Sequence, residues 1–195
     1  MLEKSLATLF ALLILATLIN RFLVWRLPER KGGEVTLRIR TWWGIVICFS
    51  LVISGPRWMT LTFFALISFL ALKEYCTLIS VHFPRWLYWG IPLNYLLIGF
   101  NCFELFLLFI PLAGFLILAT WRVLVGDPSG FLHTVSAIFC GWIMTVFALS
   151  HAAWLLMLPT TNIQGGALLV LFLLALTESN DIAQYLWGKS CGRRK

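Results

Sequence analysis

Seven apolar runs, separated by short polar or proline-containing breaks, constrain the fold of this chain more than any other feature. Only 12% of the 195 residues are charged and 61% are hydrophobic, so there are too few polar side chains to cover a water-soluble globule. The excess apolar residues must face lipid, and the sequence predicts an all-α polytopic membrane protein of about seven transmembrane or re-entrant helices. The runs are Ser5–Trp25, Trp42–Ser54, Trp58–Leu72, Trp86–Phe100, Leu105–Trp121, His133–Leu158 and Ile163–Thr177.

The basic residues are distributed unevenly between the two sides that alternating crossings would create. Thirteen of the fifteen Lys and Arg residues fall on one side, and only Lys4 and Arg57 fall on the other. The positive-inside rule then places the N-terminus outside and the C-terminus in the cytoplasm, and we expect a bacterial inner (plasma) membrane. The net charge of +7 therefore reports loop location, and no nucleic-acid partner is expected.

Segment lengths suggest three regions along the chain. Residues 1–41 comprise a first helix, uncleaved because no small-x-small site follows it, and a basic loop. Residues 42–132 form a central membrane region, and residues 133–195 begin the part with candidate chemistry. Trp42–Ser54 and Trp58–Leu72 would each rise only about 20 Å, so a shallow or re-entrant hairpin is one expectation for them.

Cysteine and histidine residues show no ligand or disulfide pattern. The five cysteines include no CxxC pair, and four of them lie inside apolar runs, where a free thiol behaves as a small hydrophobe. No HExxH-like pair joins the three histidines. His151, inside an apolar run, is expected to be a packed and hydrogen-bonded core residue.

The last polar stretch, residues 177–195, carries the candidate chemistry. If it is helical, Glu178, Asp181, Tyr185 and Gly188 share one face, and carboxylates on such a face can hold a hard cation. The glycine-rich basic end can approach phosphate oxygens. A juxtamembrane basic cluster that only fixes topology and attracts anionic lipid explains the same residues equally well. A phosphate loop is rejected because its first glycine would have to stand at Ala183.

The same stretch resembles the phosphatidate cytidylyltransferase (CDP-diacylglycerol synthase) family. Its members carry an Asn-Asp or Ala-Asp element after a transmembrane helix, then an aromatic residue and two Gly-Lys/Arg pairs. The corresponding elements here are Asn180-Asp181, Tyr185, Gly188-Lys189 and Gly192-Arg193, and Gln184 departs from the usual alanine. The resemblance covers about 50 residues, Trp142 to Lys195, and the rest matches only as a polytopic membrane protein.

This resemblance implies transfer of a cytidylyl group from CTP to phosphatidate, with release of pyrophosphate. Asp181 would be the catalytic and metal-binding residue for Mg²⁺, and the substrate-binding residues would be Asn180, Tyr185, Gly188, Lys189, Gly192 and Arg193. The family's later Lys-Thr segment and aspartate signature, which supply the principal metal ligands, are absent from the chain. We therefore expect a C-terminally truncated member, inactive as this fragment.

The partner expectations are phosphatidate and CTP, with a second copy of the chain as a candidate. Two other functions stay open. One is a non-catalytic membrane protein with a lipid-binding basic tail. The other is a small transporter, but the apolar runs contain few of the ionisable residues that transport pathways usually need.

Overall fold

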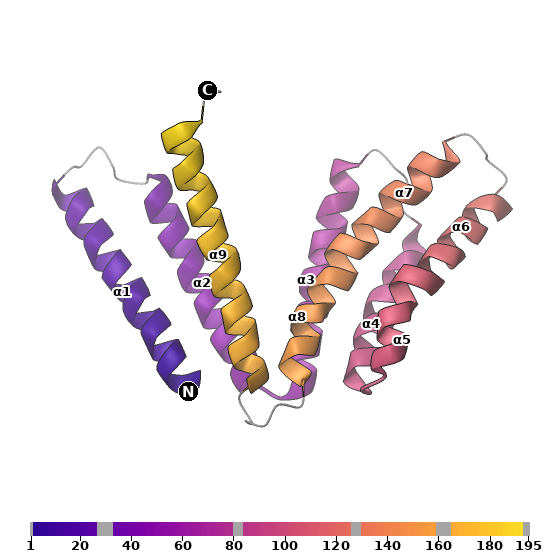
Figure 1. The fold of residues 1–195 in the computed structure, drawn as a ribbon, viewed down its shortest axis with the longest axis horizontal. Helices are drawn as coiled ribbons and strands as arrows, with labels where there is room; N and C mark the ends of the chain where they lie inside the picture. Colours follow the sequence, from indigo (N-terminus) through magenta and orange to yellow (C-terminus); the bar gives the residue numbers. More distant parts are fainter. Residues whose placement is uncertain (1, 27–32, 80–83, 126–129, 159–164, 193–195) are drawn as a thin grey trace. The chain divides into compact units, whose positions relative to one another are not determined.

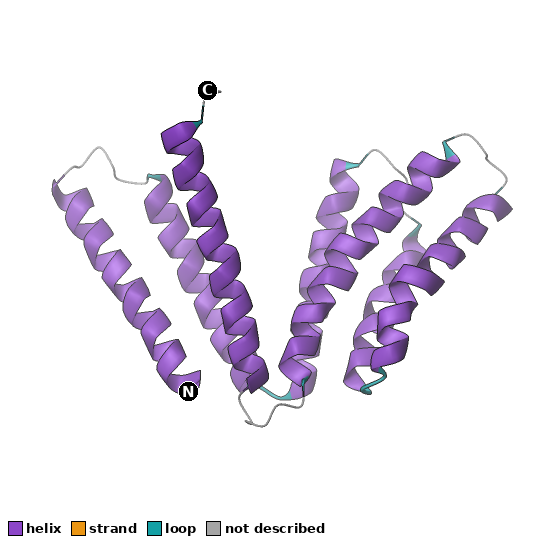
Figure 2. Cartoon of the chain, in the orientation of Figure 1, coloured by secondary structure: helices purple, strands orange, loops and turns teal. Residues whose placement is uncertain are grey.

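The computed structural model describes residues 2–26, 33–79, 84–125, 130–158 and 165–192. Within these ranges every regular element is a helix and no strand occurs (Figure 2). Each of the seven apolar runs is helical where it is described, which confirms an all-α polytopic membrane protein. In these ranges, five helices are long and apolar enough to cross a membrane: Leu6–Arg26, Val35–Ser54, Arg57–Leu78, Phe103–Leu124 and Phe131–Met157.

The chain forms two compact units. Unit 1 comprises Met1–Gly55 and Pro159–Lys195, and unit 2 is Pro56–Leu158. This division rests on contacts in space, whereas the three regions expected from the sequence divide the chain linearly and stay a prediction.

In the part of unit 1 that the structure describes there are three helices, α1 (Leu2–Arg26), α2 (Glu34–Ser54) and α9 (Gly165–Cys191), and α2 runs opposite to the other two (Figure 1). Two hydrogen bonds join α1 to α2. The Trp43 indole N–H donates to Thr17 Oγ1 over 3.0 Å, and the Asn20 amide donates to Thr36 Oγ1 over 3.1 Å. Hydrogen bonds between helices help hold them together in lipid, where apolar contacts alone give little preference for protein over acyl chains.

Basic residues of unit 1 gather where α1 ends and α2 begins, and we call this the basic end. Arg21 and Arg26 lie in the last two turns of α1, and Arg38 and Arg40 lie in the first two turns of α2. The last turns of α9 reach the same end of the unit (Figure 1). Lys4 is at the opposite end, so the charge asymmetry found along the sequence is also an asymmetry in space within unit 1.

The described residues of unit 2 form four helical rods. The first is α3 (Arg57–Leu78), and the second is a 3₁₀ turn (Arg85–Trp89) followed by α4 (Gly90–Gly99). In each of the other two rods, a π-helical segment lies between two α-helices. These rods are α5 (Phe103–Leu108), η3 (Phe109–Gly114) and α6 (Phe115–Leu124), then α7 (Phe131–Trp142), η4 (Ile143–Phe147) and α8 (Ala148–Met157).

Trp142 is the largest side chain in the buried centre of unit 2, with only 3% of its surface exposed. A Cβ atom added at Gly90 would come within 2.6 Å of its indole ring, and one added at Gly114 within 2.7 Å. These two glycines therefore let α4 and η3 pack directly against the ring. Nearby helices are joined by buried polar contacts, including a 2.7 Å hydrogen bond between the Ser68 and Tyr95 hydroxyls.

The structure corrects the expected lengths of the second and third helices. α2 begins at Glu34, inside the stretch expected to be a loop, and α3 continues past Lys73 to Leu78. Their 21 and 22 residues correspond to about 32 Å each, enough for full spans rather than a shallow hairpin. The apolar runs are shorter than the helices because each helix continues into residues with polar side chains. Such side chains at a helix end can point to water without interrupting the helix.

His151 has the packed position expected from the sequence. Its Nδ1 is 2.7 Å from the carbonyl oxygen of Phe147, one turn earlier in the same rod. Its ring lies against those of Phe106 and Phe147, with centroids 5.0 and 4.6 Å away. The five cysteines are free thiols, as their spacing predicted.

Candidate functional site

The predicted site residues from Asn180 to Lys189 lie on the second half of α9, and Gly192 directly follows its last residue. This helix runs without interruption from Gly165 to Cys191, so the polar stretch after Thr177 continues the same helix that begins with the leucine-rich run. The sequence analysis placed Asp181, Tyr185 and Gly188 on one face only if this stretch is helical, and the structure shows that it is. Arg193 lies outside the described residues, and for Glu178, Tyr185 and Lys189 the structure describes only the helix backbone.

Helical geometry separates the predicted residues into a central stripe and two flanks. At about 100° per residue, Gly188 lies within about 20° of Asp181 around the helix axis, and Tyr185 lies within about 40°. Asn180 is about 100° to one side, and Lys189 about 80° to the other. Asn180 and Asp181 therefore lie on different faces of the helix, and we assign the central stripe to Asp181, Tyr185 and Gly188.

Exposure and hydrogen bonding distinguish the polar side chains of this region. The side chains of Asn180 and Asp181 are exposed. The hydroxyls of Thr177 and Ser179 instead donate back to the helix, to the carbonyl oxygens of Leu173 (2.9 Å) and Ala175 (2.6 Å). Among the side chains that the structure describes on the central stripe, Asp181 provides the carboxylate that is accessible to a ligand.

The two glycines of the site have different structural surroundings. A Cβ atom added at Gly188 would meet no heavy atom within 4 Å in the described part of the chain. A Cβ at Gly192 would overlap the carbonyl oxygen of Gly188, to which the Gly192 N–H donates over 3.0 Å. Packing thus requires glycine at 192 but not at 188, where glycine costs the helix about 1 kcal/mol relative to alanine. Close approach of a ligand to the backbone would account for Gly188.

The described residues fit a Mg²⁺ site only of the kind that shares the ion with a substrate. No group of three His, Cys, Asp or Glu side chains gathers anywhere in the described ranges. Mg²⁺ is commonly held by one or two carboxylates together with substrate phosphates. Asp181, exposed on its stripe, is suited to contribute one such carboxylate.

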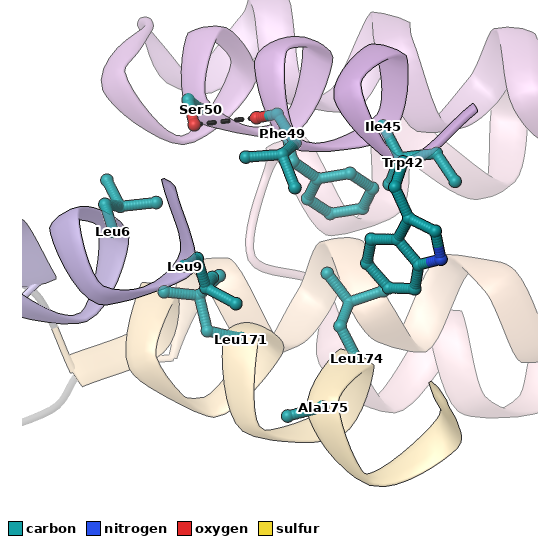
Figure 3. Close-up of a pocket in the computed structure, with 10 residues that line it drawn as sticks. Leu6, Leu9, Trp42, Ile45, Phe49, Ser50, Leu171, Leu174 and Ala175 are labelled. Carbon is teal, nitrogen blue, oxygen red and sulfur yellow. Dashed lines mark hydrogen bonds between the residues drawn. The ribbon is translucent and has the colours of Figure 1, made fainter. Parts of the chain in front are cut away.

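The central stripe continues along α9 into an apolar cavity within unit 1. Leu174 precedes Asp181 by seven residues and lies within about 20° of it around the axis, whereas Leu171 lies about 80° to one side of it. Both leucines line a cavity of about 70 Å³ between α1, α2 and α9 (Figure 3). Its lining residues are Leu6, Leu9, Trp42, Ile45, Val46, Phe49, Ser50, Leu171, Leu174 and Ala175.

The sequence did not reveal this cavity. The seven-residue spacing of Leu174 and Asp181 placed both on one helical face and was a usable signal. The part played by α1 and α2 required the three-dimensional arrangement.

Comparison with known proteins matches residues 36–195 to the cytidylyltransferase family. The chain belongs to this family. The match begins near the start of α2 and includes all of α9, so it is far more extensive than the resemblance found in the last third of the sequence.

One cytidylyltransferase-family relative is the uncharacterized protein YnbB of Escherichia coli (strain K12). It is 97% identical over 195 residues, which are 100% of this chain and 65% of YnbB. The chain therefore spans about two thirds of the length of the curated relative that it matches. No solved structure matches the chain.

Proposed function

We propose that the full-length protein transfers the cytidylyl group of CTP to phosphatidate, forming CDP-diacylglycerol and pyrophosphate. The observation that carries this proposal is the family match through α9, the helix that bears Asp181 and Gly188. The specific acceptor, phosphatidate, is supported by the Asn180-Asp181, Gly188-Lys189 and Gly192-Arg193 pattern. A lipid acceptor also suits a polytopic membrane protein.

In the proposed reaction a phosphate oxygen of phosphatidate attacks the α-phosphorus of CTP. A new P–O bond forms as the bond from that phosphorus to the oxygen bridging to the β-phosphorus breaks, and pyrophosphate leaves with the bonding electrons. Catalysis of such a transfer is mostly positioning and neutralisation of phosphate charge. Bound Mg²⁺ would supply part of that neutralisation.

The residues of α9 would divide this work between them. Asp181 would hold the metal–triphosphate group, with Asn180 as a neighbouring polar contact. Lys189 and Arg193 would neutralise phosphate oxygens. Gly188 and Gly192 would allow phosphate to approach the backbone, and Tyr185 would contribute to substrate binding. Further ligands are expected from the part of the full-length relative that this chain does not span.

The proposed orientation places the site where the two substrates can meet. We place the C-terminus and the basic end on the cytoplasmic side of a bacterial inner membrane, following the positive-inside rule. The basic residues of unit 1 support this orientation, because Arg21, Arg26, Arg38 and Arg40 share one end. Phosphatidate would then present its phosphate at the headgroup plane, and CTP would arrive from the cytoplasm.

The test compares purified full-length YnbB with the present chain in vesicles containing phosphatidate. Radiolabelled CTP and Mg²⁺ are added, and transfer of label into lipid and release of pyrophosphate are measured. We expect both products from full-length YnbB, none from the 195-residue chain, and their loss when EDTA removes the metal. Diacylglycerol in place of phosphatidate, and UTP or ATP in place of CTP, serve as controls.

Absence of labelled lipid from a folded full-length protein would overturn the proposal. Phosphatidate binding without turnover would instead favour a non-catalytic, lipid-binding protein.

A further inference from the structure

The cavity of unit 1 offers its occupant an almost wholly apolar surface. Nine of its ten lining residues have side chains of carbon and hydrogen or an indole, and the tenth is Ser50. The Ser50 hydroxyl donates to the carbonyl oxygen of Val46 over 2.7 Å, so its proton is already engaged (Figure 3). A polar headgroup would lose its hydrogen bonds to water in this cavity without replacement, whereas a hydrocarbon chain would lose nothing.

The cavity lies at a depth that suits an acyl chain of one leaflet. Leu171 lies ten residues before Asp181, and this corresponds to about 15 Å along the axis of α9. This distance is about half of the 30 Å hydrocarbon core of a bilayer. If Asp181 is at the headgroup plane, Leu171, Leu174 and Ala175 lie about 9–15 Å below it, at the depth of the acyl chains of that leaflet, and Leu6 and Leu9 extend the cavity towards the Lys4 end of α1.

The charge at the end of the cavity nearest Asp181 suits an anionic lipid. On α2, Arg38 lies one turn before the cavity residue Trp42 and within about 40° of it around the axis. Arg40, Arg21 and Arg26 are at the same end of unit 1. The apolar cavity therefore suits the hydrocarbon chain of such a lipid, and the arginines of the basic end suit its negatively charged headgroup.

We propose that the cavity between α1, α2 and α9 binds one acyl chain of an anionic glycerophospholipid, with the lipid phosphate at the basic end beside the Asp181 stripe. This inference rests on the proposed function in that it identifies the lipid with the phosphatidate acceptor. It adds that Leu171, Leu174, Trp42 and Phe49 hold the acceptor by its chain. Asp181, which shares its face of α9 with Leu174, is then positioned relative to the phosphate by the length of helix between these two residues.

Photolabelling of the present chain tests this binding without any need for turnover. The chain is reconstituted in phosphatidylcholine vesicles with phosphatidate that carries a diazirine on its acyl chain. After irradiation, mass spectrometry locates the adducts. We expect adducts on the cavity residues of α2 and α9, and weaker labelling by the corresponding neutral diacylglycerol probe.

A matched pair of variants on adjacent residues of α9 separates cavity binding from general contact with lipid. Leu171→Trp adds volume inside the cavity and should lower labelling there about tenfold, because a few methylene groups lose their contacts. Phe172→Trp places the same indole on a side chain that is 67% exposed and outside the cavity lining, so cavity labelling should not change. Ala175→Leu is a second, smaller filling variant, for use if Leu171→Trp does not fold.

Three results would overturn the inference: adducts spread evenly over the lipid-facing residues, unchanged cavity labelling in both filling variants, or equal labelling by the neutral probe. The last of these would remove the anionic headgroup from the proposal. Failure of the proposed reaction is distinguishable from these outcomes. If cavity labelling follows the variants but full-length YnbB makes no CDP-diacylglycerol, the lipid site stands and the proposed function fails.

Discussion

Arg57, at the start of α3, holds the turn that contains Asn101 after α4. Its guanidinium donates to Asn101 Oδ1 over 2.6 Å and to the carbonyl oxygen of Ile98 over 2.8 Å. Asn101 has a backbone φ of 59°, in the left-handed region that asparagine tolerates better than most residues. Arg57 therefore joins the start of α3 to the end of α4. In the sequence it was only one of the two basic residues on the less basic side.

Arg57→Ala should destabilise the protein by about 1.5–3 kcal/mol, because it removes two hydrogen bonds made by a charged donor. Thermal or denaturant unfolding in detergent measures the loss. Lys4→Ala, at an exposed position of α1, is the control and should leave the unfolding transition unchanged. A double-mutant cycle of Arg57→Ala with Asn101→Gly, which keeps the left-handed turn, should show positive coupling. Simple additivity of the two variants would contradict a direct interaction.

Substitution of asparagine for Asp181 should lower cytidylyl transfer at least about hundredfold in full-length YnbB, since the amide carries no negative charge to hold a metal–triphosphate group. The rate of CDP-diacylglycerol formation checks this. Because Asp181 is exposed, the unfolding transition should stay the same, so the activity loss can be separated from a folding defect. Asn180→Asp is the neighbouring control, and an equal activity loss in both variants would argue against the assignment of the central stripe to Asp181.

Gly188→Ala should raise helix stability by up to about 1 kcal/mol, because the added Cβ meets nothing within 4 Å in the described structure. If phosphate approaches the backbone there, the same variant should weaken the apparent affinity for CTP about tenfold in full-length YnbB. Measuring KM for CTP together with thermal stability tests both effects. A stabilised variant with unaltered KM would show that Gly188 does not serve phosphate approach.

Gly90→Ala and Gly114→Ala should each destabilise the protein by about 1–3 kcal/mol, because the new methyl group would press on the indole of Trp142. Gly44→Ala in α2 is the matched control, since a Cβ at that position has no neighbour within 4 Å. It should stabilise its helix by about 0.5–1 kcal/mol. Tm values of the three variants in one detergent provide the comparison, and a destabilised Gly44→Ala would refute the packing explanation.

The sequence predicted the helices well, because lipid exposure leaves a strong signal in the apolar runs. It did not predict where helices end, since Glu34 and Lys73 sit within helices whose polar ends need no break in the backbone. The π-helical segments at Phe109–Gly114 and Ile143–Phe147 also escaped prediction. They lie in runs with few polar residues, where a one-residue change of helical phase leaves little trace in the polar pattern.

For the candidate site, the sequence predicted that Asp181, Tyr185 and Gly188 share a face if their segment is helical. The structure shows that this segment is part of the continuous helix α9. Asn180 shows the limit of this reasoning, because adjacency in sequence suggested joint action with Asp181, but helical geometry turns the two side chains about 100° apart. The cavity depended on residues such as Trp42 and Leu171, which are distant in the chain and meet only in the fold.

The length of α9 has a consequence for how this protein experiences its bilayer. Its 27 residues extend about 40 Å, some 10 Å more than a typical hydrocarbon core. Leu171, Leu174 and Gly188 lie on one uninterrupted helix, so the distance between the cavity residues of α9 and Gly188 does not change with the surrounding lipids. In a thicker bilayer the last turns of the rod would sink relative to the phosphate plane, and in a thinner one they would rise above it. If the lipid phosphate binds level with Asp181, as proposed, cytidylyl transfer should be fastest in the bilayer whose thickness places its phosphates at that level.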